Sequence, residues 1–187
     1  MPFTFKQCVS SDGKVIEGLM EIFPKVFTDK RGCFFESYSR RDFAANRIDI
    51  NFVQDNQSSS QRGVLRGLHF QKKHPQGKLV RVIQGEIFDA ALDIRPSSPT
   101  FGQWYGVILS EREQNQFFIP PGFAHGFLVL SVSCIFAYKC TDFYHPEDEG
   151  GVIWNDPDAN IRWPNLGMDY ILSEKDEKLP FLSSLRL

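Results

Sequence analysis

The stretch KLVRVIQGEIFDAALDIR, residues 78–95, contains two runs rich in apolar residues on either side of Gly85. In an extended conformation, alternate residues of the second run form an apolar face, made of Phe88, Ala90, Leu92 and Ile94. The residues between them form a mixed face, made of Ile87, Asp89, Ala91 and Asp93. This pattern fits a sandwich whose inner strands point polar groups into a pocket, and it fits a strand with one solvent-facing side equally well.

Similar short runs recur along the chain between Gly-rich and Pro-rich turn signals. They cover Gly18–Phe23, Cys33–Tyr38, Phe52–Asn56, Lys78–Gln84, Glu86–Ile94, Trp104–Leu109, Gln116–Ile119, Gly126–Leu130 and Cys134–Cys140. Helical signals are few: one short candidate spans Arg40–Arg47, and another opens at Ser173 with an N-cap-like Ser-Glu-Lys-Asp. Many short strands at this spacing predict an all-β sandwich or barrel with short peripheral helices.

Composition sets limits on the class of protein. The 187 residues are 42% hydrophobic and 24% charged, which predicts one globular domain over residues 1–187. No apolar stretch is long enough to cross a bilayer, and the N-terminal segment lacks a secretory signal, so we expect no membrane partner and a cytoplasmic location. A net charge of −2 makes nucleic acid an improbable partner. The four cysteines lack a zinc spacing, and we expect reduced thiols.

The densest polar cluster spans Arg62–Gln71 and continues in Gln76–Lys78. On a regular strand, Arg66 and Leu68 would face one way, while His69 would face the other way with its alternate neighbours. An intervening glycine would allow close backbone approach. A ligand could bind there, although a surface strand with scattered charges explains the pattern equally well.

A second cluster, IPPGFAHGF at residues 119–127, places His125 at the start of an apolar strand. The stretches that contain His69 and His125 resemble the two half-motifs of metal cupins, so a metal cupin oxygenase or isomerase has to be considered. The first motif of a typical metal cupin supplies His-x-His and Glu, whereas here Phe70 and Gln71 follow His69. Two imidazoles without a nearby carboxylate fall short of a usual three-ligand set, so we expect no metal.

Several stretches, read together, resemble the dTDP-4-dehydrorhamnose 3,5-epimerase family from about Gly18 to Asp176. They are LRGLHFQ, QGKLVRV, SPTFGQW, IPPGFAHGF, the Tyr138-Lys139-x-Thr-Asp run, WNDP and LSEKD. The resemblance implies a cupin-type jelly roll, or double-stranded β-helix. It also implies conversion of dTDP-4-keto-6-deoxy-D-glucose to dTDP-4-keto-L-rhamnose, without a metal or an organic cofactor.

The resemblance also implies catalytic roles. The 4-ketone acidifies the C–H bonds on either side of it, and inversion at C3 and C5 needs a base, an enolate stabiliser and an acid on the opposite face. By motif position, His69 is the base, with Asp176 holding its tautomer, Lys78 lies near the enolate oxygen, and Tyr138 returns the proton. From the pattern alone, Asp176 could be the acid of a helix cap, Lys78 a solvated lysine and Tyr138 a buried aromatic.

Further residues are implied in substrate binding. Arg66 and His125 would lie along the sugar and diphosphate, Arg31 and Lys175 near the phosphates, and Glu36, Gln54 and Asn56 toward the nucleoside; Glu149 completes the binding set. Arg31 and Glu36 are expected to reach the site of a partner subunit, which implies a homodimer. The family usually carries two tyrosines after Thr-Asp, whereas this chain has Phe143 and Tyr144. Phe143 would still stack on thymine but lacks the hydroxyl.

Two rival functions stay open at this level. A 3-epimerase or 5-epimerase of another dTDP-4-keto-6-deoxysugar would share the fold and most of the motifs. A non-catalytic sugar-nucleotide binding protein on the same frame is disfavoured by the intact set of His69, Tyr138 and Asp176. Exchange of solvent deuterium into the substrate separates these readings, because binding alone exchanges no carbon-bound proton.

Overall fold

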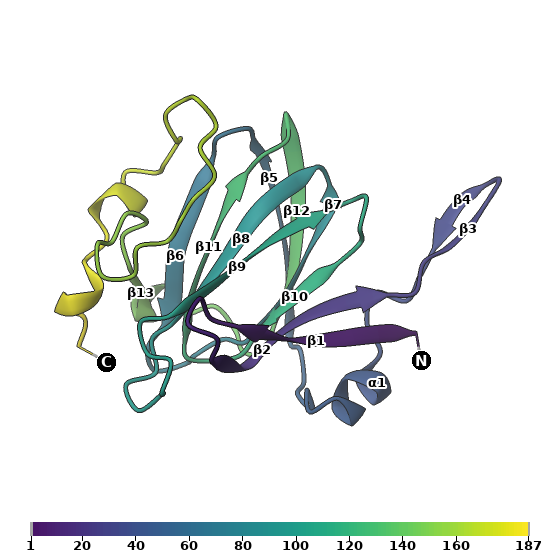
Figure 1. The fold of residues 1–187 in the computed structure, drawn as a ribbon, viewed down its shortest axis with the longest axis horizontal. Helices are drawn as coiled ribbons and strands as arrows, with labels where there is room; N and C mark the ends of the chain where they lie inside the picture. Colours follow the sequence, from purple (N-terminus) through teal and green to yellow (C-terminus); the bar gives the residue numbers. More distant parts are fainter. Residues whose placement is uncertain (1, 187) are drawn as a thin grey trace.

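The computed structural model describes residues 2–186 and contains two large antiparallel sheets that face each other (Figure 1). The six-stranded sheet has the order β1 (Phe3–Val9), β2 (Val15–Pro24), β10 (Gln116–Ile119), β7 (Lys78–Gln84), β12 (Ser133–Cys140), β5 (Gln54–Gln61). The five-stranded sheet has the order β13 (Glu149–Gly151), β6 (Leu65–Gln71), β11 (Phe123–Val129), β8 (Glu86–Asp93), β9 (Trp104–Ser110). This architecture confirms the predicted all-β jelly roll.

Short peripheral elements complete the chain. Strands β3 (Phe27–Asp29) and β4 (Gly32–Phe34) form a hairpin that projects away from the sandwich (Figure 1). The helices are α1 (Arg40–Ala45) and three 3₁₀ turns, at Pro146–Asp148, Asp176–Lys178 and Leu182–Ser184. Within residues 2–186, no helix combines the length and the apolar character needed to cross a membrane.

Strand β8 is buried on both faces, and this explains its near-continuous apolar sequence. Ile87 and Ala91 pack into the cluster between the two sheets. Ala90 and Leu92 pack on the outer face, in a second cluster that the C-terminal segment completes with Ile161 and Leu182. Asp89 therefore shares the inward face with Ile87 and Ala91, so the polar positions of this face belong to the interior and not to a solvent-facing side.

The segment after β4 departs from the prediction. The strand predicted at Cys33–Tyr38 ends at Phe34, because β4 pairs with β3 alone. Tyr38 instead packs against Phe43 of α1 and against Phe52, with ring centroids 4.9 Å and 5.2 Å away. Helix α1 is two residues shorter than predicted. Its first turn is capped by Ser39, whose hydroxyl accepts the Asp42 N–H.

Strand β5 is longer than predicted and almost purely polar. The prediction stopped at Asn56, whereas the strand runs to Gln61 through the sequence QDNQSSSQ. Half-buried and exposed residues alternate strictly along it, so its even-numbered side chains face the sandwich interior and its odd-numbered side chains face solvent. Strands β1, β3 and β13 were not predicted.

Candidate active site

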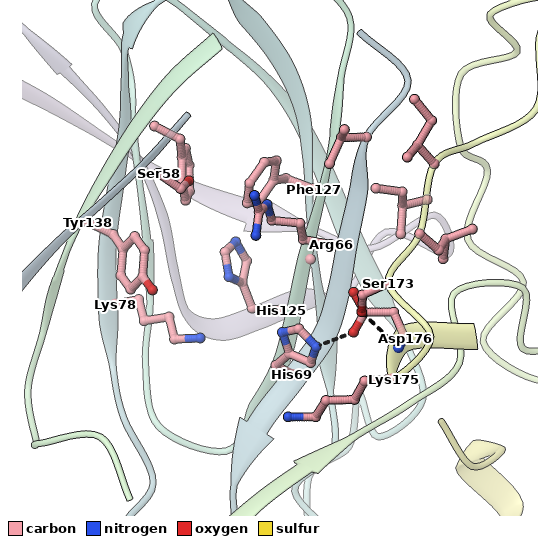
Figure 2. A pocket seen from close by; sticks show the side chains of 16 residues that line it. Ser58, Arg66, His69, Lys78, His125, Phe127, Tyr138, Ser173, Lys175 and Asp176 are labelled. Carbon is pink, nitrogen blue, oxygen red and sulfur yellow. Dashed lines mark hydrogen bonds and ion pairs between the residues drawn. The ribbon is translucent and has the colours of Figure 1, made fainter. Parts of the chain in front are cut away.

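A cavity of about 440 Å³ opens between the two sheets, and the C-terminal segment forms one of its walls (Figure 2). Seven of the predicted site residues line it: Arg66, His69, Lys78, His125, Tyr138, Lys175 and Asp176. Six do not line it: Arg31, Glu36, Gln54, Asn56, Phe143 and Glu149. The cavity also contains residues that the sequence did not single out, among them Ser58 and Phe136.

Arg66 and His69 both line the cavity, although a spacing of three would put them on opposite faces of a regular strand. The register with β11 explains this, because His125 pairs with His69 whereas Phe127 pairs with Arg66. Two residues of β6 therefore oppose one residue of β11, which is a β-bulge. The predicted opposite orientation of Arg66 and His69 is wrong for this reason.

The bulge requires glycine at position 67. Gly67 has φ +107°, a value that L side chains rarely adopt. A Cβ atom there would lie 2.6 Å from the carbonyl oxygen of His125 on the neighbouring strand. Leu68 turns away from the cavity and packs into the outer cluster. The glycine thus allows the close strand contact that brings Arg66 and His69 to one side.

His69 and Asp176 form a hydrogen-bonded pair, with His69 Nε2 2.6 Å from Asp176 Oδ1. Asp176 is only 4% exposed and begins a 3₁₀ turn, where its N–H donates to the Ser173 hydroxyl. Burial opposes ionisation of Asp176, but hydrogen bonds from His69 and Ser173 outweigh it and lower the carboxyl pKa. The Asp176 N–H thus has a partner in Ser173, while the Asp176 carboxylate bonds His69. The second ring nitrogen of His69 faces the cavity (Figure 2).

Lys78 and Tyr138 stand on the opposite wall (Figure 2). Lys78 comes from β7 and Tyr138 from β12, both in the six-stranded sheet, and Lys78 Nζ lies 5.9 Å from the centre of the Tyr138 ring. Burial lowers the pKa of the Lys78 ammonium group and raises the pKa of the Tyr138 phenol. The alternative of a solvated surface lysine is wrong, since the Lys78 side chain lies inside the cavity.

A second histidine–aspartate pair contains His125, which lines the cavity. His125 Nε2 is 2.9 Å from Asp89 Oδ1, and the two residues are 6% and 0% exposed. Burial lowers the pKa of His125, although Asp89 favours its charged form. Sequence reasoning missed Asp89 as a site residue; the signal was an acid on the inward face of β8, between Ile87 and Ala91.

The assumption that both histidines lack a nearby carboxylate is wrong. Asp176 and Asp89 are distant in sequence from His69 and His125 but each bonds one of them. Within the part of the chain that the structure describes, no group of three or more His, Cys, Asp and Glu side chains is arranged to hold a metal ion.

Glu149 lies beside the cavity and links two of its neighbouring segments. Its carboxylate pairs with Lys175 Nζ and accepts the Tyr144 O–H at 2.7 Å. Burial opposes ionisation here too, but these two partners outweigh it and lower the pKa of Glu149. Tyr144 is tied in turn to Gln54, whose side-chain oxygen accepts its backbone N–H at 3.1 Å. Glu149 therefore connects Lys175 to the segment that carries Phe143, which is 58% exposed.

The remaining predicted residues lie elsewhere. Asn56 shares the inward face of β5 with Ser58 and donates to Cys140 Sγ at 3.5 Å. Arg31 occupies the turn of the β3–β4 hairpin, where it pairs with Asp29. Glu36 follows the hairpin and is exposed. Arg31 and Glu36 do not contribute to the cavity of their own chain.

Comparison with known proteins connects this geometry to a family. A family model described as dTDP-4-dehydrorhamnose 3,5-epimerase matches residues 14–184. An enzyme of that name from Methanothermobacter thermautotrophicus is 56% identical over 162 residues, which are 86% of this chain and 88% of that protein.

Solved structures of epimerases are also similar to this chain. A dTDP-6-deoxy-D-glucose-3,5-epimerase from Legionella pneumophila, in complex with dTDP-4-keto-L-rhamnose, is similar with a TM-score of 0.91 and 49% identity. That match covers 98% of this chain and 95% of the other. A 3'-monoepimerase from Streptomyces bikiniensis, in complex with dTDP-quinovose, is similar with a TM-score of 0.85 and 32% identity, over 90% of this chain and 86% of the other.

Proposed function

The chain belongs to the dTDP-4-dehydrorhamnose 3,5-epimerase family, and we propose that its cavity carries out the family reaction with the residues assigned below. The protein is an epimerase that converts dTDP-4-keto-6-deoxy-D-glucose to dTDP-4-keto-L-rhamnose by removing and returning protons at C3 and C5. One observation carries the assignment of roles: a histidine–aspartate pair and a tyrosine face the same cavity from opposite sheets.

His69 is the proposed base. Its Nε2–H donates to Asp176, so the other nitrogen, Nδ1, carries the lone pair and faces the cavity (Figure 2). The tautomer is inferred from the carboxylate partner, which can only accept a hydrogen bond when ionised. After Nδ1 takes a proton from C3 or C5, the negative charge of Asp176 stabilises the imidazolium. Asp176 therefore both orients the base and favours its charged form.

Lys78 and Tyr138 complete the proton transfer. The Lys78 ammonium group would stabilise the enolate oxygen that develops at C4, in a cavity where burial strengthens electrostatic interactions. Tyr138 would donate its proton to carbon from the wall opposite His69. Since burial raises the pKa of the phenol, the phenol is fully protonated at neutral pH and donates as the enolate collapses. The scheme moves every proton with a side chain and requires no metal or organic cofactor.

The rest of the cavity suits a nucleotide-sugar. Arg66, His125 and Lys175 line it. Arg66 and His125 are proposed to lie along the sugar and the diphosphate, and Lys175 near the phosphates. Gln54, Asn56, Phe143 and Glu149 are proposed to form the nucleoside end. Two of them, Gln54 and Glu149, are joined through Tyr144, which supports a common location. Phe143 would stack on thymine through its exposed ring.

A homodimer is the proposed working unit. The β3–β4 hairpin projects from the sandwich and exposes Phe27 and Phe34 by 54% and 70%, which is typical of a surface that a partner covers (Figure 1). Arg31 at its turn and Glu36 after it would then reach the partner's cavity. Sedimentation of the purified protein tests this assembly. The dimer, the single domain and the cytoplasmic location stay predictions.

The test of the reaction is NMR of the purified protein with dTDP-4-keto-6-deoxyglucose in deuterated buffer that contains a chelator. Deuterium exchange at both C3 and C5, with the L-lyxo product, is the expected result. Exchange at one carbon alone would point to a mono-epimerase, and no exchange with intact binding would point to a non-catalytic binding protein. Loss of activity in the presence of the chelator would support the alternative of a metal-dependent cupin enzyme.

A further inference from the structure

The polar strand β5 presents serines on both of its faces. Ser58 and Ser60 are half-buried and face inward, while Ser59 between them is exposed. Ser58 lines the cavity directly. Ser60 contacts Arg66, whose Nε and Nη2 atoms both donate to the Ser60 hydroxyl oxygen, at 3.2 Å and 3.1 Å. Two donors on one oxygen restrict rotation of the guanidinium plane, which extends from β6 into the cavity (Figure 2).

The partner of Arg66 is a neutral hydroxyl group. Two other arginines of this chain are oriented by carboxylates, Arg31 by Asp29 and Arg95 by Asp93. Within residues 2–186, no carboxylate oxygen lies within 4.0 Å of the Arg66 guanidinium nitrogens. A carboxylate would offset the positive charge that a diphosphate needs, whereas a hydroxyl restrains the same fork and leaves the charge intact.

We propose that Ser60 is a positioning residue, which orients the Arg66 guanidinium toward the anionic substrate without neutralising it. The inference rests on the proposed role of Arg66 in binding the diphosphate and the sugar. It extends to Tyr138, because burial and Cys140 raise the pKa of the phenol while the charge of Arg66 opposes the increase. A neutral partner for Arg66 therefore also preserves a positive charge close to the proposed acid.

The test compares substitutions at Ser60 with the same substitutions at Ser59, which lies one residue away on the exposed face. Ser60→Asp should raise KM, and the Kd for dTDP measured by calorimetry, by about threefold to tenfold at fixed low ionic strength, equivalent to roughly 0.7–1.4 kcal/mol. Ser60→Ala should raise both by a smaller factor, since orientation is lost but the charge remains. Ser60→Thr, which keeps the hydroxyl, should restore both values.

The pH dependence of kcat provides a further test, because it would not change if Ser60 had a purely structural role. Ser60→Asp should shift the alkaline limb of kcat that Tyr138 contributes to higher pH, because it removes the opposing charge of Arg66. Ser59→Asp adds the same charge to the exposed face and should leave this limb, KM and the Kd for dTDP unchanged. Equal effects of the two aspartates would overturn the proposal.

Arg66→Ala separates this inference from the proposed function on which it rests. If Arg66→Ala leaves KM and the Kd for dTDP unchanged, the binding role of Arg66 is wrong. If Arg66→Ala weakens binding while the Ser60 variants behave like the Ser59 variants, Arg66 binds substrate and only the positioning role of Ser60 fails. In the Arg66→Ala background, Ser60→Ala should have no further effect; an additional loss as large as in the wild type would contradict coupling between the two residues.

Discussion

Replacement of Asp176 with asparagine removes the charge beside His69 and keeps the shape of the side chain. The affected contact is the 2.6 Å hydrogen bond between Asp176 Oδ1 and His69 Nε2. Hydrogen bonds to charged groups contribute about 1.5–3 kcal/mol, and about 1.36 kcal/mol corresponds to tenfold in rate. If the whole contribution stabilises the transition state, Asp176→Asn should slow proton abstraction by roughly 10-fold to 150-fold. The factor should be the same at C3 and C5, because His69 is the proposed base for both carbons.

The assay is the rate of deuterium incorporation at each carbon, followed by NMR at neutral pH. Glu177→Gln is the matched control, because it removes one negative charge from the adjacent, exposed position and has no contact with His69. Rates within twofold of wild type for Asp176→Asn would refute the reasoning, provided that the variant is folded. Slowing at one carbon alone would refute a common base.

The same variant makes a prediction about stability. The pKa of Asp176 is lowered in the folded protein, so its contribution to the free energy of unfolding is fully present above the ordinary carboxyl pKa of about 3.9. That contribution is lost as the pH falls through the lower folded-state pKa. Urea unfolding should therefore separate wild type from Asp176→Asn at neutral pH, and the difference should shrink below about pH 4.

Three further substitutions test other parts of the site. Tyr138→Phe should preserve some deuterium exchange but block completed inversion at the centre that the phenol serves; a normal product configuration in the NMR spectrum would exclude Tyr138 as the acid. Lys78→Met should lower kcat by about 10²-fold to 10³-fold. Burial lowers the pKa of Lys78, so the kcat of the wild type should start to decrease at a pH lower than the ordinary lysine pKa of about 10.4. Gly67→Ala should lower both stability in urea and activity, because its Cβ would meet the His125 carbonyl oxygen at 2.6 Å, whereas Gly13→Ala, with φ +84° and open space around it, measures the backbone strain alone.

The apolar strands could be predicted because buried strands consist largely of apolar residues, which are visible in the sequence. Strands β7, β8 and β12 were recognised from their apolar runs, and the mixed face of β8 indicated the interior position of Asp89 without deciding it. The bulge in β6 could not be predicted, since strict alternation is the only rule that a single strand provides. The only sign of the bulge in the sequence was Gly67. Glycine is required there because of the His125 carbonyl oxygen, which belongs to a residue nearly sixty positions away in the sequence.

Strand β5 shows why the polar wall of the cavity was missed. Hydrophobic periodicity detects a strand only when one face is apolar, and both faces of β5 are polar. Its outer face is exposed to solvent, and its inner face lines or adjoins the cavity that is proposed to bind a charged, hydroxyl-rich molecule. The polar character of Ser58 and Ser60 suits a nucleotide-sugar site, and the same polar character kept hydrophobic periodicity from detecting their strand. The neighbouring residues Gln54 and Asn56 were predicted as site residues from the family motifs alone.

The placement of the proposed base and the proposed acid on different sheets would make exchange and inversion separable events. His69 lies on the five-stranded sheet and Tyr138 on the six-stranded sheet. With the proposed roles, a substrate between them would lose a proton to one wall and regain one from the other. Each carbon that the acid reaches is inverted, and each carbon that only the base reaches exchanges its proton and keeps its configuration. A small shift of the sugar relative to Tyr138 therefore changes how many centres invert while the rest of the site stays the same. On this reasoning, an enzyme that inverts one centre and an enzyme that inverts two can share this fold and this base.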